Sequence, residues 1–121
     1  MILSILSIEQ KEIINNLLGI IRNYDESQKS NEDILDNILN YKNPIYEYLI
    51  SIGEEVYTVI TVMYIGRDGL PEGKSIQNHF ADCLKEFKVT FNTESKAASQ
   101  IKSKAKASLL EYFRKGLKIV S

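Results

Sequence analysis

The chain has 121 residues and a formal net charge of −1, with 44% hydrophobic and 26% charged residues. This length fits one domain with a single core and is too short for two typical domains. A charge so close to zero gives no overall attraction to nucleic acid or to an acidic partner. Because one cysteine cannot form an internal disulfide, a cytoplasmic location is the default expectation.

The charges are distributed unevenly along the chain. Residues 1–55 contain ten acidic and four basic residues, whereas residues 94–121 contain seven basic and two acidic ones. Ends of opposite charge attract each other in a folded protein, although solvent screening weakens the attraction. No segment reaches the eighteen apolar residues of a membrane span, and residues 1–10 lack the basic leader of a signal peptide. We therefore expect a soluble, unprocessed protein without membrane contact.

The first helix is predicted to begin after Ser7. Ser7 and Gln10 have the spacing of a capping box, and apolar residues continue at helical spacing to about Tyr24. Gly19 interrupts this helix and predicts a place where another helix comes close.

A polar loop over residues 25–30 precedes a second predicted helix over residues 30–41. The densest group of acids lies at its start and consists of Glu32, Asp33 and Asp36. Such a group could serve acid–base catalysis or bind a hard cation. Negative charge at a helix start is an equally good explanation, because it complements the helix dipole.

The least polar stretch is residues 51–69, which predicts a central helix over about residues 54–65. Ser51 and Glu54 have capping-box spacing, and Gly66 is expected to end the helix in a left-handed conformation. Its apolar face consists of Val56, Val59, Ile60 and Met63, flanked by Tyr57 and Tyr64. The alternative is a buried strand, because many of these residues are β-branched.

The helix before this stretch is predicted to start at Asn43, since Pro44 suits the first helical position. Residues 44–65 then form two helices with a break near residues 51–53, or one kinked helix. A loop rich in glycine follows over residues 67–75.

Two further helices are predicted in the C-terminal part. One runs from Ser75 to about Lys88 and is followed by a short extended piece over residues 89–93. The last helix starts at Thr93 and has Gly116 near its end. The predicted fold is all-α, a single compact domain of residues 1–121 built from five or six helices.

The order of these features resembles the domain of unknown function 3775 family of bacterial proteins. The apolar helix of residues 56–65 runs into Gly66, Arg67, Asp68 and Gly69, where that family has Gly-Arg-Gly-Asp. The C-terminal residues 109–117 are similar to the family's Leu-Leu, Tyr-Leu and Gly-Leu ending, and the acidic loop near residues 30–33 is similar in position. The resemblance implies only a compact, mostly helical fold, because that family has no established activity to carry over.

Two neighbouring pairs of residues are candidates for chemistry. Arg67 and Asp68 lie at the predicted helix end, where an arginine fork could bind a carboxylate or phosphate. The alternative is that Arg67 satisfies the last carbonyls of the helix or pairs with an acid from the N-terminal half, while Asp68 and Gly69 make the turn. His79 and Cys83 are four residues apart on one helix face, the spacing of metal ligands or of a thiol activated by imidazole.

The structural alternative for Cys83 is a core cysteine beside a partly exposed histidine, because a free cysteine on an apolar face usually packs as a small hydrophobe. A metal at this pair would need carboxylates such as Asp82 and Glu86 to complete its ligands.

Lysines and tyrosines supply two further candidates. The lysines of the last helix, with Lys102 and Lys106 nearest its apolar face, could contact nucleic acid, although a solvated face explains them as well. Tyrosines gather around the middle of the chain, and partly exposed tyrosines are favoured at protein interfaces.

These observations predict a non-catalytic protein without a cofactor, which binds another protein as an inhibitor, immunity or adaptor protein. The expected binding residues are Arg67, Asp68, Tyr57, Tyr64, Glu54 and Glu55. An acidic N-terminal half suits a basic partner, and self-association is an additional expectation. The alternatives are nucleic-acid association through Lys102 and Lys106, and a small metal or thiol enzyme around His79 and Cys83.

Overall fold

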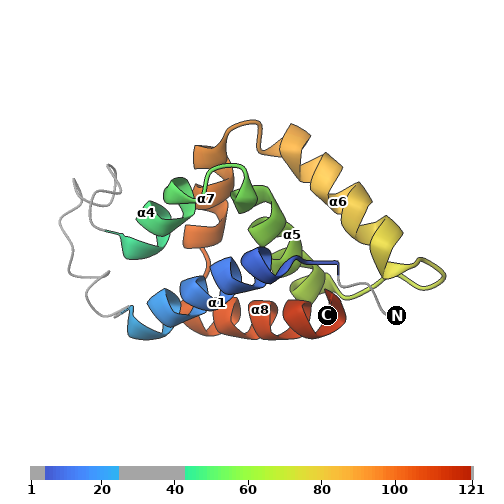
Figure 1. Ribbon diagram of the computed structural model, residues 1–121, viewed down its shortest axis with the longest axis horizontal. Coiled ribbons are helices and arrows are strands. Elements are labelled where there is room, and N and C mark those ends of the chain that lie inside the picture. The colour runs from blue at the N-terminus through green and yellow to red at the C-terminus, as the bar shows by residue number, and fades with distance from the viewer. Residues whose placement is uncertain (1–4, 25–42, 121) are drawn as a thin grey trace.

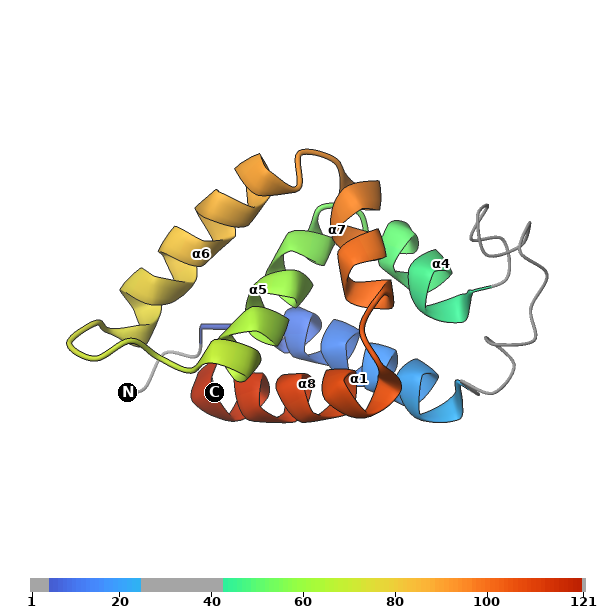
Figure 2. The ribbon, with the colours of Figure 1, turned by 180° about the vertical axis from the view of Figure 1, so that it is seen from behind.

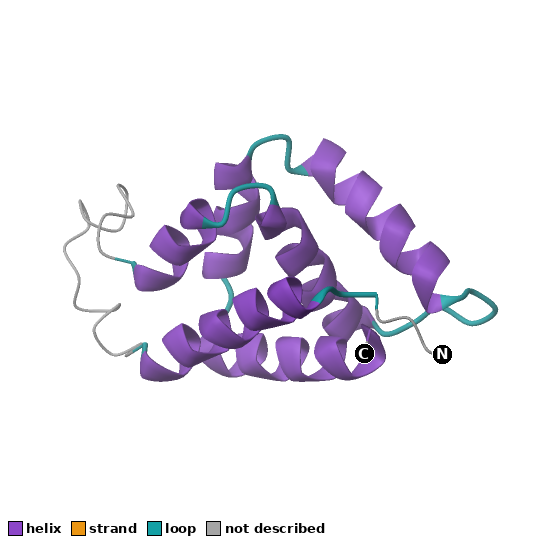
Figure 3. Ribbon diagram, viewed as in Figure 1, coloured by secondary structure: helices purple, strands orange, loops and turns teal. Residues whose placement is uncertain are grey.

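The computed structural model describes residues 5–24 and 43–120, and all regular elements within these ranges are helices (Figures 1 and 3). They are α1 (Ile8–Asn23), α4 (Pro44–Ser51), α5 (Glu55–Asp68), α6 (Ile76–Thr90), α7 (Glu94–Lys102) and α8 (Lys106–Val120). The prediction of an all-α bundle of five or six helices is confirmed. The predicted helix over residues 30–41, with its acidic cluster, lies outside the described residues.

Local capping signals start four of these helices as the sequence predicts. Ser7 forms a complete capping box with Gln10 at the start of α1. The side chains of Asn43, Ser75 and Thr93 each accept a hydrogen bond from a backbone N–H three residues further on, at the starts of α4, α6 and α7. Each cap satisfies a donor that the first helical turn leaves without a partner.

Helix α5 is the centre of the molecule, and every residue from Val56 to Gly66 is buried. The stretch forms a helix rather than the alternative strand because neighbouring helices cover it on several sides and bury its β-branched side chains. A separate helix α4 precedes it, and the break contains Gly53 with φ of 62°. Of the two predictions for residues 44–65, two helices is the correct one.

The predicted capping of α5 is wrong at both ends. Ser51 belongs to α4, where its hydroxyl donates to the carbonyl of Tyr48, and the N-cap Glu54 makes no side-chain hydrogen bond to the helix. At the other end α5 continues through Gly66, Arg67 and Asp68. Gly69, with φ of 79°, is the residue after which the chain leaves the helix.

Gly66 serves a close helix contact instead of a helix end. A Cβ atom there would overlap the carbonyl oxygen of Tyr112 and lie 2.7 Å from the backbone nitrogen of Gly116. A Cβ on Gly116 would likewise overlap the carbonyl oxygen of Val62. The two glycines therefore let the backbones of α5 and α8 touch. Within the described residues the close approach expected at Gly19 is absent, because no atom beyond the neighbouring part of α1 lies within 4 Å of a Cβ built at that position.

The C-terminal part also differs from the prediction of one long helix. It divides into α7 and α8 at residues 103–105, so that Ile101 and Leu109, both fully buried, reach the core from helices of different direction (Figure 2). Helix α6 extends to Thr90, which replaces the first part of the extended piece predicted over residues 89–93.

The helices around α5 have unequal contact with it. Helix α8 crosses the C-terminal half of α5, α1 lies along α8, and α4 and α7 pack together near the start of α5 (Figures 1 and 2). Helix α6 runs along one side of the molecule as the second arm of a hairpin with α5. Phe80 is its one buried residue. None of the helices in the described ranges has the length and apolarity needed to cross a membrane.

Candidate functional site

A cleft of about 500 Å³ lies between the C-terminal end of α5 and the helix α6. Its walls combine aromatic side chains, an ion pair and the histidine–cysteine pair. Its lining includes Tyr64, Arg67, His79, Cys83, Phe87 and Phe91. A cleft of this size with mostly apolar walls and a few polar groups has the properties of a ligand or peptide-binding site.

One wall of the cleft is a row of three aromatic rings from α5, α6 and the residue that directly follows α6. The ring of Phe87 lies 5.2 Å from that of Tyr64 and 5.9 Å from that of Phe91, measured between centroids. Phe87 and Phe91 are half-buried. Tyr64 is buried, and its hydroxyl accepts a hydrogen bond of 2.8 Å from the side-chain amide of Gln100. The wall is thus fixed by Gln100 at one end and remains partly open at Phe87 and Phe91.

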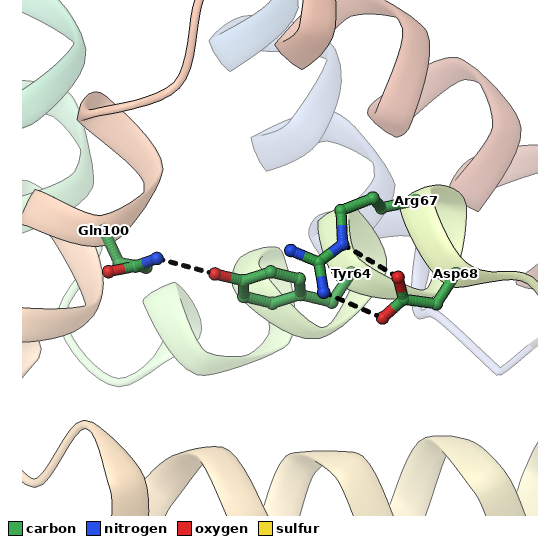
Figure 4. A network of polar contacts seen from close by, with 4 residues as sticks. All are labelled: Tyr64, Arg67, Asp68 and Gln100. Atoms are coloured by element: carbon green, nitrogen blue, oxygen red, sulfur yellow. Dashed lines mark hydrogen bonds and ion pairs between the residues drawn. The ribbon is translucent and has the colours of Figure 1, made fainter.

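The guanidinium of Arg67 lies over the face of Tyr64, with 4.4 Å between its Cζ atom and the ring centroid (Figure 4). Its Nε and Nη2 atoms donate to the two carboxylate oxygens of Asp68 at 2.8 and 3.1 Å. This hydrogen-bonded carboxylate raises the pKa of the Arg67 guanidinium. The Nζ atom of Lys104 lies 5.8 Å from the same ring centroid, so two cations flank Tyr64.

His79 and Cys83 line the same cleft from α6. The Sγ atom of Cys83 is 3.5 Å from Nε2 of His79, so the predicted shared helix face is confirmed. Burial, followed by the negative charge of Glu86, raises the pKa of the Cys83 thiol and favours its protonated form. A nucleophilic or metal-binding cysteine needs the thiolate. Within the described ranges, no group of three or more His, Cys, Asp and Glu side chains could hold a metal ion.

The other predicted binding residues do not join this cleft. Glu54 and Glu55 lie at the opposite end of α5, where Glu55 accepts a hydrogen bond of 3.1 Å from Gln10. Tyr57 is buried, and its hydroxyl donates to the carbonyl of Phe91 at 2.8 Å. Burial, with the charges of Glu94 and Glu54, raises the pKa of that hydroxyl. The expectation that Tyr57 and Tyr64 are partly exposed is therefore wrong, although the face of Tyr64 lines the cleft.

The two lysines proposed for nucleic acid lie on different helices. Lys106 starts α8, and its ammonium donates to the carbonyls of Arg22 and Tyr24 at 2.7 and 2.8 Å. These carbonyls belong to the end of α1, where a cation complements the helix dipole. Lys102 is the last residue of α7. The pair therefore does not form one basic face on a single helix.

Three side chains were not among the predicted site residues: Phe87 and Phe91, which line the cleft, and Gln100, which donates to the hydroxyl of Tyr64. Phe87 belonged to the apolar face predicted for its helix, so its spacing identified it as a packing residue only. Phe91 fell in the piece predicted as extended, and Gln100 carries no distinctive signal. These residues come together because α5, α6 and α7 pack near one another. Local sequence patterns do not predict that packing.

Comparison with protein-family models, with curated proteins and with solved structures finds no match for this chain. The resemblance drawn from residues 66–69 and 109–117 stays a prediction. The candidate site is accordingly defined by its geometry alone.

Proposed function

We propose that this protein is a non-catalytic binding module, of the inhibitor, immunity or adaptor type, that holds an apolar segment of another protein in the α5–α6 cleft. The proposal rests on the aromatic wall of a cleft of about 500 Å³, in which Phe87 and Phe91 are partly exposed and pack in a row with the buried ring of Tyr64. Aromatic rings that remain accessible in a concave site give a partner large contact area with little loss of conformational freedom.

The position of α6 supports a binding role for this cleft. Phe80 alone is buried on α6, and residues on the outer side such as Val89 are well exposed, with 76% of Val89 accessible. A helix attached along one side leaves a groove beside it, and a peptide segment can lie in such a groove. Apolar contact in the groove would supply affinity, while the polar groups at its mouth would select the partner.

Two observations favour binding over the alternative functions. The raised pKa of the Cys83 thiol opposes thiolate formation, on which metal binding or nucleophilic attack by this residue would depend. The ammonium of Lys106 is held by the end of α1, so it contributes less to a surface for phosphate groups.

Selection of peptides from a random library displayed on phage tests the proposal. The immobilised wild-type protein should enrich sequences with aromatic or large aliphatic residues, and synthetic copies should bind it in solution. Phe87→Asp should abolish this binding, because it places a charge in the aromatic wall. Val89→Asp is the matched control, since it adds the same charge to the exposed side of α6 and should leave binding unchanged.

Circular dichroism spectra of both variants establish that the helices remain intact. Failure to enrich any peptide would contradict the proposal. Enriched peptides that bind Phe87→Asp as well as wild type would place the binding surface elsewhere.

A further inference from the structure

The ion pair at the mouth of the cleft joins Arg67, whose guanidinium also packs on an aromatic ring, to the more exposed carboxylate of Asp68. The guanidinium of Arg67 rests on Tyr64 at 4.4 Å, and Tyr64 is itself held by Gln100. The hydrogen bonds described for the Asp68 carboxylate come from Arg67, and the Asp68 side chain is 57% exposed against 42% for that of Arg67. Exposed ion pairs contribute little net free energy, so another carboxylate can replace Asp68 at small cost.

The guanidinium fork of Arg67 already binds a carboxylate. Two parallel N–H···O hydrogen bonds of 2.8 and 3.1 Å join it to a carboxylate of an aspartate side chain (Figure 4). Arg67 is the positively charged side chain in the lining of the cleft, where Asp68 and Glu86 are negative. Its fork is therefore the place where an acidic group on the incoming segment finds a complementary charge.

We propose that Asp68 acts as an internal stand-in for a partner's carboxylate, and that the cleft recognises a protein segment in which Asp or Glu neighbours an aromatic or large aliphatic residue. The acidic side chain displaces Asp68 from the Arg67 fork, while the apolar side chain packs on Phe87 and Phe91. This inference rests on the proposed function and specifies the contact segment of the partner. It also makes that segment acidic, whereas the charge of the N-terminal half predicts a basic partner.

Synthetic peptides acetylated and amidated at their ends test this inference, because an internal side chain then carries their only carboxylate. One series places Asp or Glu next to Phe, Leu or Trp in a Gly–Ser background, and a matched series replaces the acid by Asn or Gln. Binding is followed by shifts of the backbone amide resonances of α5 and α6 in two-dimensional NMR spectra, with titration into the millimolar range. Wild type should bind the acidic series about two- to fivefold more tightly than the amide series.

Three variants distinguish paired hydrogen bonding by the Arg67 guanidinium from general electrostatic attraction. Asp68→Asn removes the internal competitor and should strengthen binding of the acidic series about two- to fivefold, with little effect on the amide series. Arg67→Lys keeps the charge but loses the two parallel hydrogen bonds, so it should remove most of the discrimination. Asp82→Asn makes the same charge change at an acid that pairs with Lys74, and it should leave both series unchanged.

The outcomes distinguish this inference from the proposed function. Equal binding of both series, abolished by Phe87→Asp, would overturn the carboxylate inference and keep the cleft as a binding site. Weaker binding of the acidic series to Asp68→Asn would also overturn it, because Asp68 would then assist the ligand instead of competing with it. Absence of saturable binding by any peptide would count against both proposals. Binding that is unchanged in the Phe87→Asp variant would do the same. Acidic peptides that gain affinity only when their terminal amide is replaced by a free carboxyl would identify a chain terminus as the ligand.

Discussion

Helix α5 packs against α8 on one side and against α6 on another, and the two contacts are built differently. Against α8 the backbones touch through Gly66 and Gly116, and Leu109 and Phe113 are fully buried. Against α6 large aromatic rings keep the helices apart and leave a cleft of about 500 Å³. Residue size at these two contacts goes with their packing, since two glycines allow backbone contact and large aromatic rings accompany an open cleft.

The largest expected effect comes from adding a methyl group to the glycine contact. Gly66→Ala would push a Cβ atom into the carbonyl of Tyr112, and backbone on both sides cannot move aside without separating the helices. We expect a loss of about 3 kcal/mol in the free energy of unfolding, measured by urea denaturation. If Gly66→Ala is as stable as wild type, the α5–α8 contact tolerates an added side-chain atom as well as the α5–α6 contact does.

Gly19→Ala is the matched control, because no atom lies within 4 Å of a Cβ at that position in α1. It should raise the free energy of unfolding by about 0.5–1 kcal/mol, the usual advantage of alanine over glycine inside a helix.

A smaller and more local effect is expected on the α6 side. Phe80 is the one buried residue of α6 and is 9% exposed, so Phe80→Ala should cost roughly 2 kcal/mol, the transfer free energy of the side chain, because α6 lies at the edge of the core and can close the space that is left. The cost should fall on α6, whose backbone amides should exchange hydrogen faster while those of α5 and α8 keep their protection. Val89→Ala, at an exposed position of α6, should change neither the free energy of unfolding nor the hydrogen exchange of the α6 amides. Equal loss of protection in α5 and α8 would mean that α6 belongs to the same cooperative unit as the core.

The smallest expected effect concerns the thiol in the cleft. Burial and Glu86 raise the pKa of Cys83, so less thiolate is present at any given pH than for an exposed cysteine. Alkylation by iodoacetamide should be several-fold slower than in the urea-unfolded chain, and the rate should keep rising above the ordinary thiol pKa. Glu86→Gln should speed the reaction by removing one cause of the shift. A native thiol that reacts faster than the unfolded one at neutral pH would instead indicate activation by His79.

Signals confined to a few neighbouring residues were read correctly from the sequence. The caps at Ser7, Asn43, Ser75 and Thr93 depend on hydrogen bonds between residues three apart, so the pattern of residue types suffices to find them. Ser51 shows the limit of such patterns. It has capping-box spacing with Glu54, yet α4 continues through it and its hydroxyl bonds the carbonyl of Tyr48.

The candidate site was only partly accessible to the same reasoning. Arg67 and Asp68 were identified because they follow a long apolar run, and they do line the cleft. Tyr57, Glu54 and Glu55 were grouped with them, although α5 places them toward its opposite end. The rings of Phe87, in α6, and Phe91, which directly follows it, come from another part of the chain, so their place beside Tyr64 depends on how α6 folds back along α5.

The sequence by itself determined the all-helical class, four helix starts and a central helix, predicted over about residues 54–65 and found at Glu55–Asp68, because caps and apolar periodicity act within a single turn or helix face. Only the tertiary structure decided that Gly66 is a helix contact, that residues 94–120 divide into two helices and that a cleft opens beside Arg67. These features arise where residues distant in the chain meet. The packing of whole helices sets such meetings, and no local preference records them.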